Sequence, residues 1–365
     1  MSNISVNTIT DASGGSTASI NGLTPQASNM QPFNRIINGA MTIDQRNAGA
    51  AVTPASQDYT LDRFKWVLSA ASKLSCGQNA GAVATPVGFK NYLGVTSLSA
   101  YTVGASEQFS LQHHIEGFDV ADLNWGAASA KTVTLSFQVY SSLTGTFGGI
   151  LRNSAQDRIY IFSYSIPVAN TWTTISITIS GDTTGTWLTT NGIGITASFS
   201  MGSGATLSGT AGSWGSTYYT SATGATSVVG TSGATFYITG VQLEAGSTAS
   251  SFAHEFVGDT LQKCQRYFTK FQTDGTGFVN STSQLRITLP LVPNMRTTPA
   301  IGVSSASHFL LEGPNGGTIT SFSLDQASPR IAAINCNHAS TLTAGNCLQL
   351  MCNNGSAKFE LDAEL

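Results

Sequence analysis

The sequence contains few charged residues and no long apolar run. Only 10% of its 365 residues are Asp, Glu, Lys or Arg, against about 25% in an ordinary soluble domain. The 16 Lys and Arg residues are too few for the dense basic surface that sequence-independent nucleic-acid binding requires. No run of about 18 apolar residues occurs, so we expect no membrane insertion. These two absences exclude nucleic acid and the membrane interior as partners.

Signatures of secretion and of common catalytic sites are also absent. The N-terminus MSNISVNTITDASGG has neither a basic n-region nor an apolar h-region, so we expect no signal peptide. There is no G-x-S-x-G elbow, no phosphate-binding G-x-x-x-x-G-K-[ST] loop and no H-E-x-x-H metal pair. Exposed carboxylates are present, but nothing in the sequence brings two of them together as glycoside hydrolysis requires. We therefore expect a protein without enzymatic activity.

Five cysteines are present, and none stands in a C-x-x-C pair. Three of them, Cys336, Cys347 and Cys352, lie near His338, which leaves free thiols, a disulfide and a metal site as alternatives. Structural zinc sites usually carry closer ligand pairs, and a chain without a signal peptide usually keeps its thiols reduced. The residues themselves therefore predict no metal and no cofactor.

The residues that take the place of charge are serine, threonine and glycine. The chain has 45 Ser, 46 Thr and 38 Gly, together more than a third of its length. All three are poor helix formers, whereas Thr favours strands. The hydrophobic fraction of 41% is nevertheless sufficient for a core. The composition predicts a mainly β protein.

Apolar and polar residues alternate with a period of two in several segments between about 33 and 256. The clearest examples are 63–68, 132–140, 173–179 and 193–201. This alternation is typical of antiparallel sheets with one buried face. In 235–244 the alternation slips by one residue at Gly240, which predicts a β-bulge.

These patterns divide the chain into four parts. We expect an extended N-terminal arm, an antiparallel β-sandwich, one connecting helix and a small C-terminal β domain. The corresponding ranges are 1–30, 31–256, 257–272 and 273–365. The helix is predicted from an apolar stripe at helical spacing, formed by Leu261, Cys264, Phe268 and Phe271.

Aromatic residues beside glycines are the candidate ligand-binding residues. Flat rings next to polar side chains suit sugars, because the C–H face of a sugar packs on a ring while its hydroxyls find polar partners. The candidates are Trp125, Trp187, Trp214, Tyr218 and Tyr219. The alternative is that these rings only cap the ends of sheets. In 109–116 the alternation points His113 inward, as a core histidine, and His114 outward.

Three segments carry a family resemblance. They are 34–46 (NRIINGAMTIDQR) with 59–66 (YTLDRFKW), 164–187 (YSIPVANTWTTISITISGDTTGTW) and 236–268 (FYITGVQLEAGSTASSFAHEFVGDTLQKCQRYF). In their order and spacing they resemble a β-sandwich module found in bacteriophage virion proteins, especially tail fibres and other appendages. With PNMRTTP and the terminal LDAEL, the resemblance covers most of 33–365.

The resemblance implies a jelly roll of the carbohydrate-binding type and a place on the exterior of a phage particle. It also implies a homotrimer whose N-terminal arm, 1–30, contacts other virion proteins, and synthesis in the host cytoplasm. Some sandwiches of this type hold a structural calcium, for which no ligands are assigned here.

The leading hypothesis is therefore a tail fibre or spike subunit that binds a host cell-surface glycan, with three linked sites raising avidity. A head fibre, capsid decoration or tail-adaptor protein without a glycan ligand is the alternative. A polysaccharide depolymerase is less favoured, because the chain shows no regular repeat.

Overall fold

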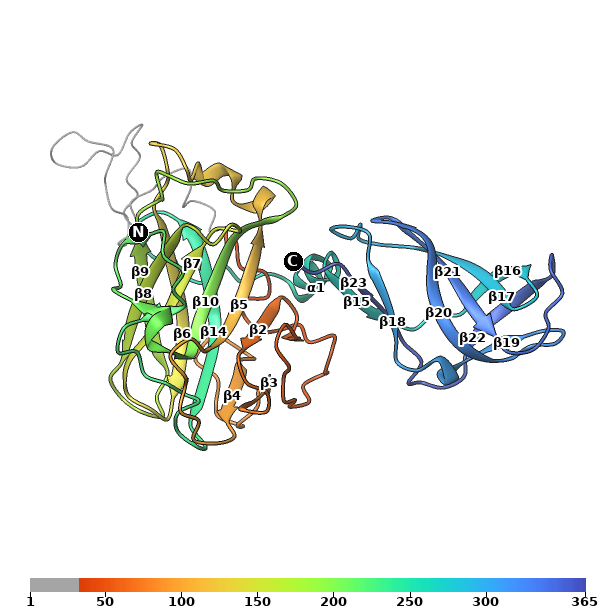
Figure 1. The fold of residues 1–365 in the computed structure, drawn as a ribbon, viewed down its shortest axis with the longest axis horizontal. Helices are drawn as coiled ribbons and strands as arrows, with labels where there is room; N and C mark the ends of the chain where they lie inside the picture. The colour runs from red at the N-terminus through yellow and green to blue at the C-terminus, as the bar shows by residue number, and fades with distance from the viewer. Residues whose placement is uncertain (1–32) are drawn as a thin grey trace, which may run out of the picture.

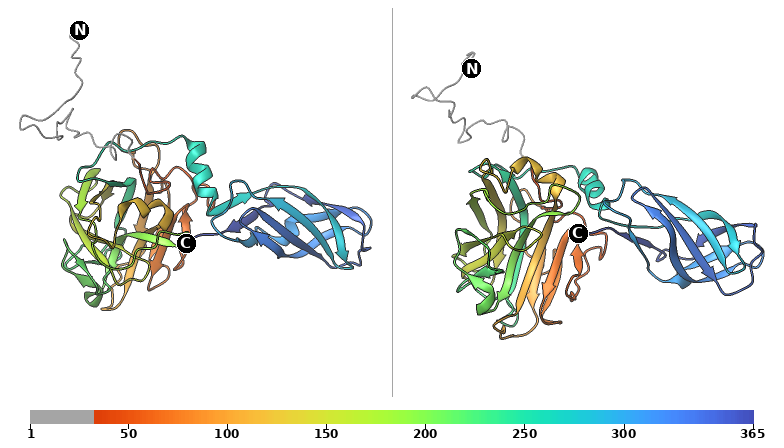
Figure 2. Two further views of the ribbon diagram at one scale, coloured as in Figure 1. Left: turned by 90° about the horizontal axis from the view of Figure 1, so that it is seen from above. Right: turned by 45° about the horizontal axis from the view of Figure 1, so that its top comes forward.

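The protein consists of a β-sandwich and a smaller β-barrel joined by one helix (Figure 1). The computed structural model describes residues 33–365, and the predicted arm over 1–30 lies outside the described residues. In all three ribbon views the two bodies lie side by side, with the helix and the C-terminus at their junction (Figures 1 and 2). No helix in the described part of the chain is long and apolar enough to cross a membrane.

The sandwich is built from two antiparallel sheets. The larger has the order β1 (Tyr59–Leu61), β2 (Phe64–Leu68), β5 (Gln108–Glu116), β10 (Ile193–Ser203), β7 (Gly145–Arg152), β8 (Ile159–Ile166) and β12 (Trp214–Gly215). The smaller has the order β3 (Leu74–Gln78), β4 (Leu93–Ser97), β14 (Thr235–Ala245), β6 (Val133–Ser141) and β9 (Thr173–Ile179). A short parallel pair, β11 (Ser208–Gly209) and β13 (Ser221–Ala222), lies in the 202–233 segment. Short 3-10 turns lie at Gly117–Asp119, Ala121–Leu123, Ala205–Leu207 and Ala306–His308.

The order of strands confirms the predicted jelly roll. The neighbours β4, β14, β6 and β9 form one sheet, and β5, β10, β7 and β8 form the centre of the other. Successive strands from β4 to β7 therefore alternate between the two sheets, and β14, the last long strand, pairs with β4 and β6. This interleaving of first and last strands is the double Greek key of a jelly roll.

The alternating strands bury one face, as the sequence predicts. In β6 the inward residues Val133, Leu135, Phe137 and Val139 are almost completely buried. The central strands β5 and β10 are buried on both faces, so polar residues on their outer face are also removed from solvent. The cause is that other parts of the chain, among them Tyr218, Tyr219 and Leu365, cover the outer face of the larger sheet.

The predicted bulge in β14 is confirmed. Its pairing with β6 shifts register between Thr239 and Gln242, and Gly240 between them has φ +62°. A Cβ at Gly240 would lie 2.6 Å from the ring of Phe89. Glycine is therefore needed here both for the left-handed backbone and for the close approach of an aromatic ring.

The connecting helix is shorter than predicted. Helix α1 spans Val257–Gln265, and Phe268–Phe271 forms strand β15, which pairs with β23 (Phe359–Asp362). The prediction of a helix over 257–272 is therefore wrong at its C-terminal end. Phe268 and Phe271 fit a helical stripe in sequence, but pairing with a strand about 90 residues away extends the backbone there instead.

The C-terminal body starts at β15 and contains a closed barrel. Strands β15, β23 and β18 (Ala300–Val303) form a three-stranded sheet next to the helix. The barrel has the order β16 (Gly275–Ser281), β17 (Gln284–Pro290), β21 (Ile331–His338), β20 (Gly317–Ser328), β19 (Phe309–Glu312) and β22 (Cys347–Cys352). This body has its own apolar core, separate from that of the sandwich. The sandwich and the C-terminal body therefore each have a packed core of their own.

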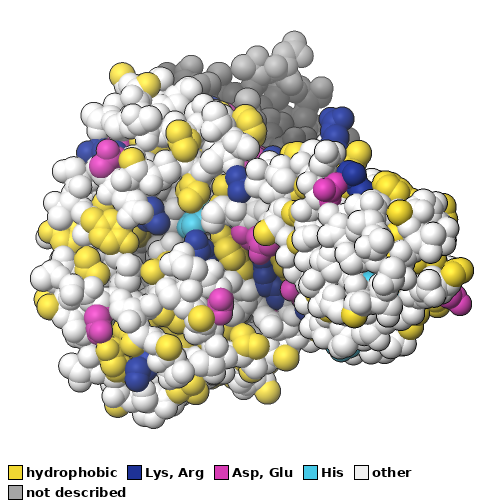
Figure 3. Space-filling model, turned by 45° about the vertical axis from the view of Figure 1, so that its right-hand side comes forward, with side chains coloured by type: hydrophobic (Ala, Val, Ile, Leu, Met, Phe, Trp, Pro, Cys, Tyr) yellow, Lys and Arg dark blue, Asp and Glu magenta, His cyan; other side chains and the backbone are white. Residues whose placement is uncertain are grey.

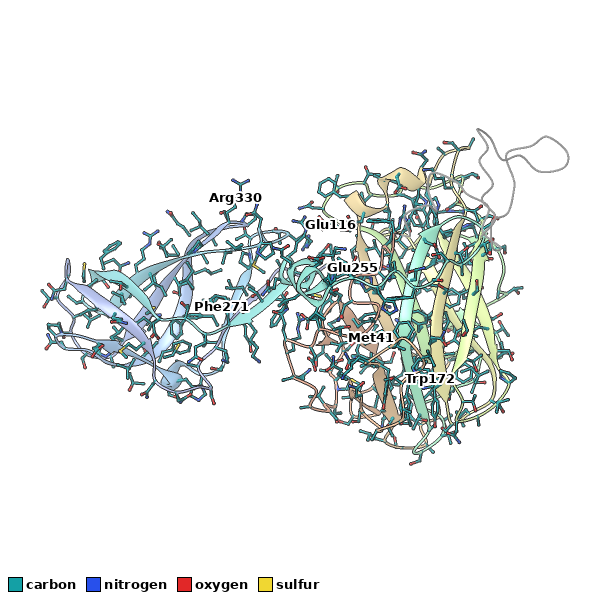
Figure 4. The ribbon with its side chains drawn as sticks, turned by 180° about the vertical axis from the view of Figure 1, so that it is seen from behind. Met41, Glu116, Trp172, Glu255, Phe271 and Arg330 are labelled. Atoms are coloured by element: carbon teal, nitrogen blue, oxygen red, sulfur yellow. The ribbon has the colours of Figure 1, made fainter. Side chains whose placement is uncertain are left out.

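The two bodies also make polar contacts with each other. Arg266, which follows α1, forms a bidentate ion pair with Glu116 at the end of β5, with N–O distances of 2.6 and 3.0 Å. Figure 4 labels Glu116 on the helix side of the sandwich and Phe271 on the barrel side of the helix. The C-terminal residue Leu365 returns to the sandwich, where its main-chain oxygen accepts hydrogen bonds from Tyr59 and His114.

Candidate functional site

The five predicted ligand-binding aromatics fall into two separate groups. Trp125, Trp187 and Trp214 pack together at one end of the sandwich, with ring centroids 4.7 to 5.4 Å apart and rings nearly perpendicular. Each indole N–H donates to a main-chain carbonyl, those of Lys131, Thr184 and Ser180 respectively. Satisfied N–H groups and mutual edge-to-face packing are typical of structural tryptophans.

A pocket nevertheless opens beside two of these rings. Its volume is about 460 Å³, and its lining includes Trp125, Trp187 and Leu188 together with Asn124 and Thr186. None of the described residues that line it is charged. Trp125 and Trp187 are each 9% exposed, so little of either ring is open to a ligand in the pocket. This pocket suits a small uncharged ligand.

Tyr218 and Tyr219 lie elsewhere, over the outer face of the larger sheet. They pack on a small apolar cluster that contains Ile150, Ile159 and Ile161 and is distinct from the sandwich core. The hydroxyl of Tyr218 lies 3.4 Å from the side-chain amide of Gln108, and both tyrosines are half-buried. The two tyrosines therefore flank a different surface from the three tryptophans.

That surface is a row of polar side chains across four adjacent strands. In one line of partners, Lys65 of β2 stands opposite Gln112 of β5, which stands opposite Ser198 of β10. In the neighbouring line, His114 of β5 stands opposite Thr196 of β10, which stands opposite Arg152 of β7. Directly paired residues of antiparallel strands share a face. We call these six residues the polar row.

Most of the polar row is buried, and several of its polar atoms have no partner. Gln112, His114, Arg152, Thr196 and Ser198 are between 0% and 7% exposed. Within residues 33–365, no hydrogen bond reaches Nε of Arg152, Oγ1 of Thr196 or Oγ of Ser198. A buried polar atom without a partner costs about 1–3 kcal/mol. Most buried polar atoms in proteins are paired, so unpaired ones on one face call for a partner, which water or a ligand can supply.

The two cations of the polar row, Lys65 and Arg152, form no ion pair in the described part of the chain. Within residues 33–365, no Asp or Glu oxygen lies within 4.0 Å of the charged atoms of Lys65 or Arg152. Burial lowers the pKa of Lys65 and that of Arg152, and Arg152 lowers the pKa of Lys65 further. Burial, together with Lys65 and Arg152, lowers the pKa of His114 to about 3, so its ring is neutral at pH 7.

One side of the polar row is bordered by the C-terminal segment. Nδ1 of His114 lies 2.9 Å from the main-chain oxygen of Leu365, and the hydroxyl of Tyr59 donates to the same oxygen at 2.6 Å. A carbonyl oxygen only accepts, so the neutral His114 ring carries its proton on Nδ1. His113, on the inner face, contacts the main-chain oxygen of Ile37 and the ring of Phe64. It is therefore the core histidine that the alternation predicts.

The cysteine cluster that left three alternatives open contains free thiols. Cys336 is buried in the barrel, Cys347 is exposed, and Cys352 donates to the main-chain oxygen of Thr273. Within residues 33–365, no three His, Cys, Asp or Glu side chains are close enough to hold a metal ion. The described residues therefore assign no ligands to the calcium that the resemblance raises.

Comparison with known proteins finds structural likeness only. No family model and no curated protein sequence matches the chain. Among solved structures, the enzymatically active domain of tailspike protein 4 of bacteriophage CBA120 aligns with a TM-score of 0.32 and 11% identity, over 58% of this chain and 21% of that one. The carbohydrate-binding module TmCBM61 in complex with β-1,4-galactotriose aligns with a TM-score of 0.28 and 10% identity, over 59% and 99% of the two chains.

A third structure is similar to the same degree. The family 11 carbohydrate-binding module of a cellulosomal cellulase of Clostridium thermocellum gives a TM-score of 0.27 and 13% identity, over 55% of this chain and 98% of that one. The chain matches only about a fifth of the tailspike domain's length. At such low TM-scores the likeness has no functional weight, and function has to be inferred from this chain's own geometry.

Proposed function

We propose that this chain is a glycan-binding subunit of a bacteriophage appendage, such as a tail fibre or spike, and that it acts by binding and not by catalysis. The observation that carries the proposal is the polar row, in which the buried Nε of Arg152 and the hydroxyls of Thr196 and Ser198 have no hydrogen-bond partner among residues 33–365. Sugars present many hydroxyls that both donate and accept hydrogen bonds, so they can satisfy such a row.

The surroundings of the polar row also suit a sugar. Tyr59, paired with Lys65, stands at one border, and Tyr218 stands over the other side near Gln108. Both tyrosines are half-buried, so each presents part of a ring to a ligand. Polar groups with aromatic rings beside them match the usual composition of ligand sites.

The place on the virion rests on the resemblance of the three sequence segments to phage appendage modules. In this proposal the protein is a homotrimer on the exterior of the particle, and residues 1–30 contact other virion proteins. Three identical sites on one appendage raise the strength of attachment well above that of one site. Weak binding at each polar row then suffices for adsorption.

The test is binding of the purified chain to an array of bacterial surface glycans. We expect at least one glycan to bind, with an affinity about tenfold lower in the double variant Thr196→Val, Ser198→Ala, because two hydrogen bonds of about 0.5–1.5 kcal/mol each are lost. Ser176, which is exposed on β9 of the other sheet, provides the matched control Ser176→Ala. Absence of any bound glycan, or equal affinity in both variants, would refute the proposal. Shortening of the bound polymer would refute the non-enzymatic part.

A further inference from the structure

We propose that the polar row selects acidic glycans, with Arg152 and Lys65 binding the carboxylate or phosphate of the sugar repeat. This inference rests on the proposed function and specifies its ligand class. It follows from the charges of the row, whereas the proposed function follows from its unpaired hydroxyl and guanidinium groups.

The strongest observation is a contrast among the buried arginines. Arg35, Arg63 and Arg152 are 4%, 0% and 7% exposed. Arg35 pairs with Asp122 and Arg63 pairs with Glu364. Arg152 pairs with no carboxylate in the described part of the chain, and its one hydrogen bond is a long contact of 3.4 Å from Nη1 to the main-chain oxygen of Asn153.

A buried charge without a counter-charge is costly. Taking an ion out of water costs several kcal/mol, and proteins usually offset this cost with an opposite charge and hydrogen bonds. Arginine stays protonated at any physiological pH, so Arg152 cannot avoid the cost by losing its proton. An anionic ligand that accepts hydrogen bonds from Nε and the Nη atoms would offset it, because guanidinium matches carboxylate and phosphate geometry.

Lys65 supplies a second cation at the opposite border of the row. Lys65 on β2 and Arg152 on β7 are separated by three strand spacings, or about 14 Å at about 4.8 Å per spacing. Between them lie only neutral groups, including Gln112 and Ser198. This arrangement suits a sugar repeat that lies across the strands with an acidic group over a cation.

The carboxylate that acts on the charge of Lys65 is already paired. The charge of Glu364 raises the pKa of Lys65. The Glu364 carboxylate, however, pairs with Arg63 and, at 3.3 Å, with Arg46. Figure 3 shows the wider setting: a sandwich surface that is mostly uncharged, with a histidine between Lys or Arg side chains. On so weakly charged a surface, two cations without counter-ions on one face impose a clear preference for anions.

The experiment compares ligands of matched size by calorimetry. The probes are a neutral hexose oligosaccharide, a hexuronic-acid oligosaccharide, a glycerol-phosphate oligomer and inorganic phosphate. We expect at least one acidic oligomer to bind about tenfold or more tightly than the neutral one, and this preference to weaken at high salt. The better acidic oligomer then identifies carboxylate or phosphate as the recognised group.

Variants separate this inference from the proposed function. Arg152→Gln should remove the preference for acidic oligomers, Lys65→Gln should reduce it, and Arg330→Gln, at an exposed arginine of the barrel, should leave it unchanged. Lys65 is only half-buried, so its variant keeps the test valid if Arg152→Gln does not fold. Equal binding of neutral and acidic oligomers would overturn the inference and leave the proposed function standing. Binding of inorganic phosphate as strong as that of the oligomers would also overturn it, and binding of no oligosaccharide would refute the proposed function itself.

Discussion

The guanidinium carbon of Arg63 lies 3.5 Å from the centre of the Tyr267 ring. Arg63 belongs to the tight turn between β1 and β2 and has φ +73°, whereas Tyr267 follows helix α1. The hydroxyl of Tyr267 donates to Glu116, and Arg63 also pairs with Glu364 near the C-terminus. A fully buried cation of the sandwich is thus enclosed by groups that belong to the barrel side.

We predict that Glu364→Gln weakens the contact between sandwich and barrel. The substitution leaves the buried Arg63 without its carboxylate, and breaking a buried ion pair on one side costs about 3–5 kcal/mol. Denaturant unfolding should show a lower free energy of unfolding. Small-angle scattering of the folded protein should show a larger average separation of the two bodies. Glu312→Gln, at an exposed glutamate of the barrel without an ion pair, is the control. Equal stability of the two variants would contradict a stabilising role of the Arg63–Glu364 ion pair between sandwich and barrel.

The tryptophan cluster gives a second prediction. Trp125→Ala removes a ring that contacts both Trp187 and Trp214, and loss of a large buried side chain costs about 3–5 kcal/mol. Urea unfolding should show this loss. Trp172 is half-buried and directly precedes β9 of the other sheet. Its replacement by alanine should lower the free energy of unfolding by less. If Trp187→Ala instead kept full stability and abolished glycan binding, the tryptophans would be the ligand residues that the sequence predicts.

Acid should destabilise the protein in part through His114. The unfolded chain takes up a proton near pH 6.5, but the folded pKa is about 3, so the free energy of unfolding falls as the pH falls between these values. The contribution is about 1.4 kcal/mol per pH unit. Asp62, whose pKa burial raises to about 6, acts in the opposite direction. The variant His114→Asn, compared with the wild type at pH 7 and pH 5, isolates the histidine.

We expect the stability of His114→Asn to fall less on acidification than that of the wild type, by about 1.4 kcal/mol per pH unit. His254→Asn, at an exposed position, should follow the wild type. Parallel pH profiles for all three proteins would show that His114 titrates in the folded state as it does in the unfolded chain.

Thiol reactivity checks the state of the cysteines. The exposed Cys347 should react quickly with a disulfide reagent at pH 8, and the half-buried Cys352 more slowly. Burial raises the pKa of Cys76 to about 11 and that of Cys336 to about 12, and it also raises the pKa of Cys264. These three should react only after unfolding. Fewer than five thiols in the unfolded, unreduced protein would instead reveal a disulfide.

Local sequence patterns predict the strands well, because the alternation of apolar and polar residues within a strand reflects its buried and exposed faces. The alternation in 173–179 matches β9 residue for residue, and the slip at Gly240 marks the bulge of β14. The helix prediction goes wrong at Phe268 and Phe271, where pairing with β23 decides the backbone. That partner lies about 90 residues away and leaves no trace in the local pattern.

The candidate site was harder to predict because it depends on strand order. The alternation points His114 outward, but it does not show that β2, β5, β10 and β7 are neighbours. The sequence therefore does not single out Arg152 as a candidate site residue. The clustering of the predicted aromatic residues also depends on the fold. Trp125, Trp187 and Trp214 stand beside glycines in separate segments, and only the folded chain brings them into one cluster. A group without a counter-charge becomes visible only when all its spatial neighbours are known.

The antiparallel pairing of β15 with β23 has a mechanical consequence. The chain enters the barrel through β15 and leaves it through β23, and the residues after β23 bind Arg63, Tyr59 and His114 of the sandwich. The barrel is therefore held at two points of the chain. A pulling force on its far end divides between the covalent link through α1 and the non-covalent contacts of the residues after β23, and β15 and β23 are also hydrogen-bonded to each other. The barrel therefore resists bending better than a domain on a single flexible linker would.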